Sequence, residues 1–440
     1  MIKVLFQHKC DTLIALLMPA LLSAMTVTHN FVFLYAILGL CVCRIHKPVV
    51  IFPVYFIASL STAYFVISEG VSAGRFLSLI MIISLVIDIV RKGGNHQVDG
   101  YFPLWILFVV YCFISAVLSV TGSLVPFALL IQGLLVLLLF PKIKEMDIEY
   151  FCSLLYFACL IAFIGVCVQF VSIGFDQLLY ERYKGIEGET NSNRIAMMVM
   201  QMGLVIISPF IANEKNKVIR WVSVVGFILA IVIIILTGSR ASLLASLMAF
   251  LILFFELSRQ NFKKYIIPAV VVTGVALVVV QQFSLVDSVV LDRFSLQSLE
   301  DSGGSDRMPA IQILLTHIFP QYPLFGVGLG GGNFNAVAIL YGMDHPCHNI
   351  FFDSLAQLGL VGVIIFICLC FKIFRNTWKS FNYATYQFPF IIALLLTFGA
   401  VINGMGETVY VEKWFWNALS LCLFFTVNKD CCIEWGNTKN

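Results

Sequence analysis

The residues of this 440-residue chain that are best suited to chemistry fall within one segment, residues 305–362. Arg307 lies near its start, and His345 and His348 precede the return to apolar sequence. A histidine can act as a general base near neutral pH, and the planar guanidinium of arginine binds phosphate or carboxylate through paired hydrogen bonds. A histidine at a membrane edge can equally be a polar cap, which is the alternative interpretation of His348.

The neighbours of His348 limit the chemistry that it can support. Asp353 follows about one and a half helical turns later, roughly opposite the histidine, so Asp344 or His345 is the better candidate for its orienting partner. Cys347, His348 and Asn349 are contiguous, and adjacent side chains point apart. Because catalytic triads are assembled in space rather than in series, a cysteine nucleophile is disfavoured.

A second arginine, Arg240, lies in the short link Thr237–Ser242 between two apolar runs. A turn of this length places Arg240 at the start of a helix, close to the membrane interface. A charge at this depth is costly and by default marks a functional site, and the amides of a helix N-terminus attract anions. The alternative is a side chain that only reaches out to the lipid headgroups.

The glycine-rich run Pro323–Gly332 resembles a phosphate-binding loop only loosely, because it lacks the Gly-Lys-Ser/Thr ending. We expect a flexible or tightly packed turn, with a backbone nest for pyrophosphate at Gly328 and Gly330 as the alternative. Neither the acidic residues nor the cysteine pairs have metal-ligand spacing, and nucleic-acid motifs are absent. We therefore expect no metal, no cofactor and no nucleic-acid partner.

The composition identifies the class of protein. Hydrophobic residues make up 60% of the chain and charged residues 12%, with a mean hydropathy of +0.97. Soluble domains have about 25% charged residues. The apolar runs are long enough for helical crossings, which take about 17–25 residues, and the alternating strands of a barrel do not recur. We predict an all-α polytopic integral membrane protein with about 12–14 transmembrane helices and a large outer loop that contains short helices.

Apolar runs between polar breaks predict fourteen spans, of which residues 31–43 are short for a full crossing. The spans are residues 12–28, 31–43, 49–67, 75–90, 102–120, 124–140, 151–174, 194–212, 220–236, 240–257, 265–282, 349–371, 387–403 and 413–427.

The basic residues support this alternation of spans. With the N-terminus in the cytoplasm, 19 of the 27 basic residues fall on the inner side, as the positive-inside rule requires. The inner set is mainly lysine, whereas arginine predominates in the outer set, and arginine is the better bidentate ligand for anions. The outer arginines are thus candidates for ligand binding, with pairing to nearby acids as the alternative. The outer set is Arg75, Arg182, Lys184, Arg194, Arg240, Arg293, Arg307 and Lys413.

Two outer segments, residues 174–193 and 282–347, are longer than simple turns, and long ordered loops are usually functional. In the second, Asp306 can cap a helix that has Arg307 and Pro309 in its first turn and ends at Pro320. The apolar stripe expected on this helix is Met308, Ile311, Leu314, Leu315 and Ile318.

These features divide the chain into four parts. We expect an N-terminal transmembrane scaffold, a transmembrane core with arginine-bearing loops, a large outer loop, and C-terminal helices with an inner tail. The boundaries are residues 1–174, 175–282, 283–347 and 348–440.

Taken in order, the motifs resemble the bacterial O-antigen polymerase and O-antigen ligase superfamily. The resemblance covers about residues 180–365, and the N-terminal spans match only as generic membrane helices. Arg182 with Gly185, and Asn191-x-Asn193, are similar to the family's upstream loop. The more specific motifs are Gly238–Leu244 opening a span, Arg307 heading a helix, Pro323–Gly330, and His348-Asn349 followed by Gly359-x-x-Gly362.

The resemblance implies a glycosyltransferase of the bacterial inner membrane whose active site faces the periplasm. Its donor is a glycan on undecaprenyl pyrophosphate, and neither a metal nor a nucleotide sugar is needed. Carried over by position, His348 is the general base or positions the acceptor, and Arg240 and Arg307 hold the pyrophosphate. Arg182 assists, and the further residues expected to bind substrate are His345, Asn349, Gly328 and Gly330.

Four functions remain open at this point, one of which is that of a protein O-glycosylating relative. A polymerase transfers the chain to a lipid-linked repeat unit and a ligase transfers it to lipid A–core; the number of spans and the two outer loops favour the polymerase. A transporter of lipid-linked oligosaccharide is the third alternative, but it is expected to have cations inside a central cavity. The expected partners are the lipid bilayer, the undecaprenyl-pyrophosphate-linked glycan and a chain-length regulator.

Overall fold

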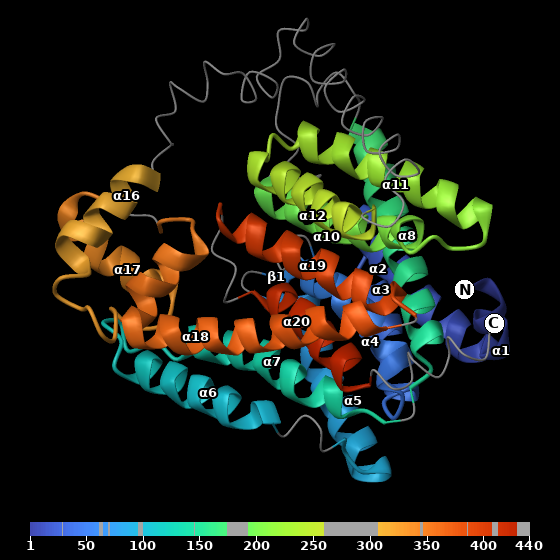
Figure 1. Ribbon diagram of the computed structural model, residues 1–440, viewed down its shortest axis with the longest axis horizontal. Coiled ribbons are helices and arrows are strands. Elements are labelled where there is room, and N and C mark those ends of the chain that lie inside the picture. Colours follow the sequence, from blue (N-terminus) through green and yellow to red (C-terminus); the bar gives the residue numbers. More distant parts are fainter. Residues whose placement is uncertain are drawn as a thin grey trace, which may run out of the picture.

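The computed structural model shows a bundle of helices that run roughly side by side (Figure 1). It describes residues 1–28, 30–60, 65–68, 71–95, 100–144, 146–173, 192–258, 307–343, 346–384, 386–406 and 412–428.

The helices of the N-terminal half begin with a short α1 and continue with seven long or apolar helices. Their bounds are α1 Ile2–Gln7, α2 Lys9–Thr28, α3 Val32–Cys43, α4 Pro48–Leu60, α5 Ala73–Lys92, α6 Phe102–Val117, α7 Val125–Leu139 with the 3₁₀ turn Phe140–Lys142, and α8 Ile148–Ile173.

The second half adds the helices of the bundle centre and two short helices. Their bounds are α10 Ser192–Ile211, α11 Lys217–Leu236, α12 Arg240–Ser258, α16 Arg307–Ile313 with the π turn Leu314–Ile318, α17 Gly331–Ala338 with the 3₁₀ turn Ile339–Tyr341, α18 Ile350–Tyr383, α19 Phe388–Gly404 and α20 Lys413–Val427.

This architecture confirms the prediction of an all-α, multi-pass membrane protein. Among the described residues, seven helices are both long and apolar enough to cross a bilayer, and several shorter apolar helices accompany them. Each predicted span coincides with a helix except residues 265–282, which lie outside the described residues. Residues 31–43 form a helix of 12 residues, as short as expected.

Two predicted boundaries are wrong. The helix in the span predicted at 49–67 is Pro48–Leu60, and the last residues of that span belong instead to a short strand, β1 Val66–Ser68, which pairs antiparallel with β2 Val71–Ser72. The helix at the span predicted for 349–371 continues to Tyr383. It therefore extends beyond its apolar part into a segment with basic residues. Hydropathy marks where a helix is apolar and not where its hydrogen bonds end.

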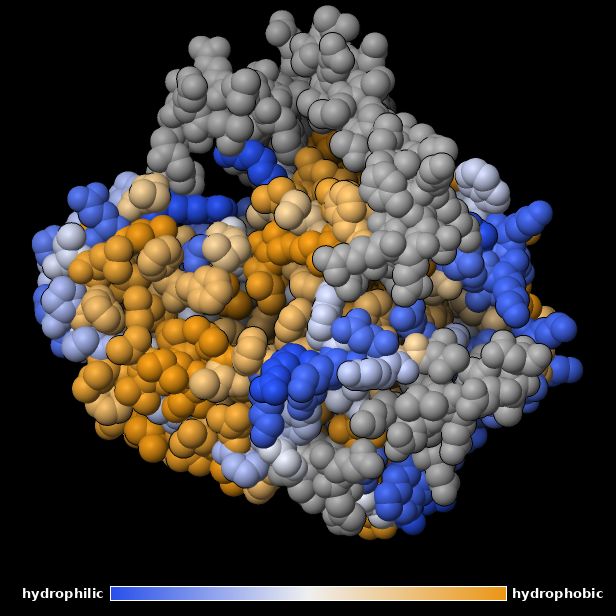
Figure 2. Space-filling model, in the orientation of Figure 1, coloured by the Kyte–Doolittle hydropathy of each residue, from blue (hydrophilic) through white to orange (hydrophobic). Residues whose placement is uncertain are grey.

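Helices α10, α19 and α20 form the centre of the bundle, and nearly all their residues are buried. Helix α10 packs against α11, α12 and α19, and α20 packs against α7 and α18. Helices that are apolar all round are typical of such a centre. The face over α6 and α18 is largely apolar in Figure 2, with exposed Ile106, Phe113 and Phe371, and such a continuous apolar surface indicates contact with lipid.

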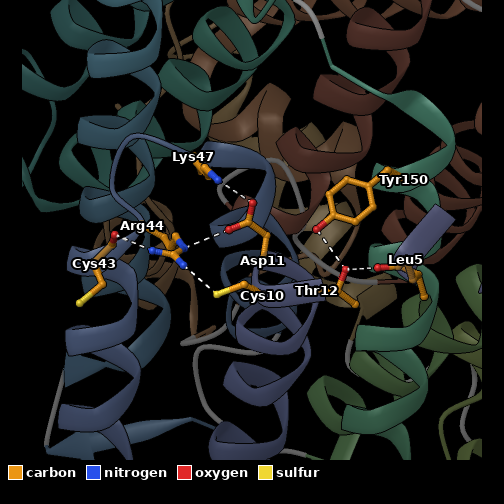
Figure 3. A network of polar contacts seen from close by, with 8 residues as sticks. All are labelled: Leu5, Cys10, Asp11, Thr12, Cys43, Arg44, Lys47 and Tyr150. Carbon is orange, nitrogen blue, oxygen red and sulfur yellow. Dashed lines mark hydrogen bonds and ion pairs between the residues drawn. The ribbon is translucent and has the colours of Figure 1, made fainter. Parts of the chain in front are cut away.

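A polar network ties α2, α3 and α4 together near the N-terminus (Figure 3). The Asp11 carboxylate accepts from Arg44 Nε at 3.0 Å and from Lys47 Nζ at 2.6 Å, while Thr12 Oγ1 donates to the Leu5 carbonyl and contacts Tyr150. The N-terminus lies at the opposite end of the bundle from α16 and α17 (Figure 1). Arg44 and Lys47 belong to the basic set that the sequence places on the inner side.

The helix predicted after Asp306 exists as α16 and its π turn, with Arg307 and Pro309 in the first turn. Its predicted apolar stripe is partly wrong, because Met308 and Leu315 are exposed. The buried side chains are Ala310, Leu314 and Ile318, four residues apart, and they join a small apolar cluster with α17. This cluster fixes α16 at one end of the bundle.

Candidate functional site

Arg240 is the first residue of α12, after a tight link from α11. Gly238 makes the turn with φ +68°, a region that favours glycine, and its amide donates to the Ile235 carbonyl at 2.8 Å. The Arg240 side chain is half-buried, and its Nη1 is buried with no hydrogen-bond partner among the described residues. Buried N–H groups are rarely left unpaired, so this guanidinium is suited to a ligand.

The last turn of α19 and the two residues after it, Asn403–Gly406, form a corner against which three distant segments meet. Ser242 Oγ, in the first turn of α12, donates to Asn403 Oδ1 at 3.0 Å. Asn349 Nδ2, at the start of α18, donates to the Met405 carbonyl at 3.0 Å. We refer to residues 403–406 as the 403–406 corner.

The start of α16, with Arg307 as its first residue, is the third segment at this corner. A Cβ built on Gly406 would lie 3.4 Å from Arg307 Nη1 and 2.7 Å from the Cβ of Ala241, the residue after Arg240. The absence of a side chain at Gly406 therefore allows α12 and Arg307 to approach the same point. The structure thus brings the start of α12, Arg307 and Asn349 together around the 403–406 corner.

His348 adopts a left-handed backbone conformation with φ +50°, which few residues other than glycine do. The Asp353 carboxylate holds this turn, since it accepts from the Cys347 amide at 2.9 Å and from the Asn349 amide at 3.1 Å. Asn349 Oδ1 caps α18 by accepting from the Phe351 amide at 3.0 Å. Asp353 therefore positions His348 through the main chain, a role that its helical spacing from the histidine did not predict.

The glycine-rich run packs against a break in α18. Gly359 has φ +63° and ψ −173° inside that helix, which frees the carbonyls before it. The Val327 amide donates to the Ala356 carbonyl at 2.9 Å, and the Gly328 amide donates to the Gln357 carbonyl at 3.1 Å. Backbone groups that are buried in an irregular segment require such partners.

Gly328 and Gly330, predicted to bind substrate, have their amides engaged within the protein. The Gly330 amide donates to Gln357 Oε1 at 2.8 Å. A Cβ on Gly328 would lie 2.4 Å from Ser119 Cα, and one on Gly330 2.4 Å from Pro126 Cγ. These contacts favour the tightly packed turn over the backbone nest as the interpretation of the run.

The thiol of Cys347 is the other potentially reactive group next to His348. Burial raises the pKa of the Cys347 thiol to about 12, and the Asp353 carboxylate adds to the rise, which opposes a thiolate nucleophile. No group of three or more potential metal ligands occurs among the described residues. Arg182, Asp344 and His345 lie outside the described residues.

An apolar groove of about 310 Å³ lies between α18, α19 and α20. Ile350 and Phe351 line it directly after Asn349, and Val401 lines it two residues before Asn403. The rest of the lining is almost entirely aromatic and aliphatic, and Phe351, Ile367, Phe371 and Val401 are also exposed on the surface of the bundle. On α18 the groove thus begins directly after Asn349, the residue that contacts the 403–406 corner.

The sequence reasoning missed the 403–406 corner, which it treated as the end of a generic span. The available signal was an asparagine inside an apolar run, followed by two glycines at Gly404 and Gly406. A polar side chain within a membrane helix requires a partner there, and here the partner is Ser242.

The chain was compared with models of protein families. Residues 225–367 match a family model described as O-antigen ligase. The match includes Arg240, Arg307, Gly328, Gly330, His348 and Asn349, and it ends before the 403–406 corner. A search of curated protein sequences found no match to the chain.

Proposed function

We propose that this membrane protein is an O-antigen polymerase, or a polymerase of a related surface polysaccharide. The match of residues 225–367 to the O-antigen ligase family model supports this proposal. Its reaction transfers a glycan from undecaprenyl pyrophosphate to a lipid-linked repeat unit. The active site faces the periplasm of a bacterial inner membrane, at the end of the bundle that carries α16 and α17.

In the proposed reaction, a hydroxyl oxygen of the acceptor sugar bonds to the anomeric carbon of the donor glycan. The bond between that carbon and the pyrophosphate oxygen breaks, and its electron pair leaves with undecaprenyl pyrophosphate. His348 takes the proton of the acceptor hydroxyl. Arg240 and Arg307 stabilise the charge that develops on the leaving group, because preorganised cations act most strongly where charge appears.

The observation that carries this proposal is the meeting of Arg307, the start of α12 and Asn349 at the 403–406 corner. These segments are far apart in the sequence. Among the described residues, neither Arg240 nor Arg307 forms an ion pair. With respect to that part of the chain, both guanidinium groups are therefore available to an anionic substrate.

The apolar groove supports the lipid-linked nature of the substrate. It begins next to His348-Asn349 and is lined by phenylalanines such as Phe366 and Phe371. A polyprenyl chain whose pyrophosphate lies at the 403–406 corner can extend into this groove and exclude its apolar surface from water.

An O-antigen ligase, which transfers the glycan to lipid A–core, is the second candidate, and the match to an O-antigen ligase family favours it. Lipopolysaccharide from a deletion strain distinguishes the two. Core that carries a single repeat unit indicates a polymerase, whereas bare core with polymer retained on the lipid carrier indicates a ligase. Unchanged lipopolysaccharide and surface polysaccharide in that strain would contradict both functions.

We expect Asp353→Asn to slow glycan transfer at least tenfold with normal protein levels. A hydrogen bond to a charged group is worth about 1.5–3 kcal/mol, and the amide can accept from only one of the two backbone N–H groups that fix His348. The measurement is the transfer rate of the purified protein with a synthetic lipid-linked repeat unit. Ser354→Ala, at the next buried position of α18, is the matched control, and a wild-type rate for Asp353→Asn would exclude this positioning role.

A further inference from the structure

The buried side-chain amide of Asn403 takes no part in the reaction proposed above. Its side chain is fully buried in the last turn of α19. Asn403 Oδ1 accepts from Ser242 Oγ at 3.0 Å, whereas Nδ2 is buried and has no hydrogen-bond partner in the described part of the chain. An unpaired buried donor costs free energy unless an acceptor is supplied.

The orientation of this amide follows from its neighbours on α12. Ser239 Oγ donates to Ser242 Oγ at 3.3 Å, and Ser242 Oγ uses its own hydrogen on Asn403 Oδ1. In this arrangement the amide oxygen of Asn403 faces Ser242, whose hydroxyl donates to it. The amide nitrogen therefore points away from Ser242.

Two arginines belong to segments that meet at the same corner as Asn403. Arg240 Nη1 is also buried without a partner among described residues, and Arg240 is in the same helical turn as Ser242. Arg307 Nη1 and the Asn403 carbonyl oxygen lie 3.4 and 3.6 Å from the position that a Cβ of Gly406 would occupy. Arg307 Nη1 and the Asn403 backbone thus lie close to the same point at Gly406, and Arg240 lies in the helical turn that contacts the Asn403 side chain.

We propose that Asn403 Nδ2 is a third donor to the pyrophosphate, beside Arg240 and Arg307. This inference rests on the proposed function, since it assumes that the two arginines bind that group. A pyrophosphate has more acceptor oxygens than one guanidinium can satisfy, and a neutral amide fixes its orientation without adding repulsion between cations. The competing role is structural, in which Asn403 only ties α19 to α12 through Ser242.

The test is the binding of farnesyl diphosphate, a short polyprenyl diphosphate, to the full-length protein in lipid nanodiscs by calorimetry. We expect Asn403→Ala to weaken binding about tenfold, as the loss of a hydrogen bond to a charged group does. Asn403→Asp should weaken binding further at neutral pH, because it places a carboxylate beside the phosphate oxygens. The deficit relative to wild type should shrink as the pH falls and that carboxylate is protonated, a change that a purely structural role does not predict.

The controls use Gln201, a buried amide in the middle of α10 whose Nε2 also lacks a partner among the described residues. Gln201→Ala and Gln201→Glu should bind within about twofold of wild type, and thermal unfolding reports whether each variant is folded. Asn403→Ala introduces no buried charge, so it decides the question if Asn403→Asp does not fold.

The outcomes separate this inference from the function on which it rests. Wild-type binding by folded Asn403→Ala, together with lost binding in Arg307→Ala, overturns the role of Asn403 and leaves the proposed function standing. If wild-type protein does not bind the probe, or Arg307→Ala binds it equally well, the pyrophosphate site itself is wrong and the inference falls with it.

Discussion

Replacing His348 with asparagine is expected to lower the rate of glycan transfer by about 10²–10⁴-fold, the usual contribution of a positioned general base. Asparagine is the informative replacement because, like histidine, it tolerates the left-handed conformation that this position has at φ +50°. His348→Ala removes the same base but adds backbone strain of about 1–2 kcal/mol. The measurement is the initial rate with a purified lipid-linked repeat unit.

The pH dependence gives a second measure of the histidine's role. A general base acts in its neutral form, so the wild-type rate should fall as the pH becomes acidic, and the residual rate of His348→Asn should not share that fall. His348→Asn at the wild-type rate would show that the histidine only caps the interface, the alternative that the sequence left open. Unfolding curves of the two variants then separate a loss of chemistry from a loss of structure.

Most of the transmembrane architecture could be predicted, because burial in lipid requires long apolar helices and the positive-inside rule gives an independent check on their order. The errors concern the C-terminal ends of two helices. Helix α4 stops at Leu60 before a hairpin, and α18 continues through Lys372 and Lys379 to Tyr383. Both ends depend on backbone hydrogen bonds and on packing against neighbours, which hydropathy does not report.

Part of the candidate site could be predicted from the types of its residues. Arg240, Arg307 and Asn349 were singled out from charge, position and motif, and the structure places their segments around one corner. The corner itself was not predicted, because its role depends on contacts between α19 and segments more than 50 residues away. No local pattern specifies such contacts.

The structure of the glycine-rich run also could not be predicted from its sequence alone. Its spacing suggested either a packed turn or a phosphate nest, and the difference depends on what its amides contact. The acceptors are the carbonyls released at the Gly359 break, in a helix that follows the run in the sequence. Long-range satisfaction of backbone groups therefore distinguishes the two interpretations.

Arg307→Ala is expected to lower the transfer rate by about 10³-fold and Arg307→Lys by about 10²-fold, within the range found for donors and cations that stabilise a transition state. Lysine keeps the charge but loses the planar pair of donors, so it restores only part of the effect. Arg240→Ala is expected to act like Arg307→Ala, since both arginines meet the same leaving group in the proposed reaction. Rates are measured with the purified protein and the same lipid-linked repeat unit.

The matched control is Arg220→Lys, at the start of α11 and about 24 Å along that helix from the link that leads to Arg240. It retains the topological charge and should transfer at the wild-type rate. A structural role for Arg307 makes a different prediction, because a cation beside the C-terminal end of α19 stabilises that helix by about 0.3–1 kcal/mol. In that case Arg307→Ala would lower the unfolding temperature slightly and leave the transfer rate of the folded protein unchanged, which would remove Arg307 from the proposed reaction.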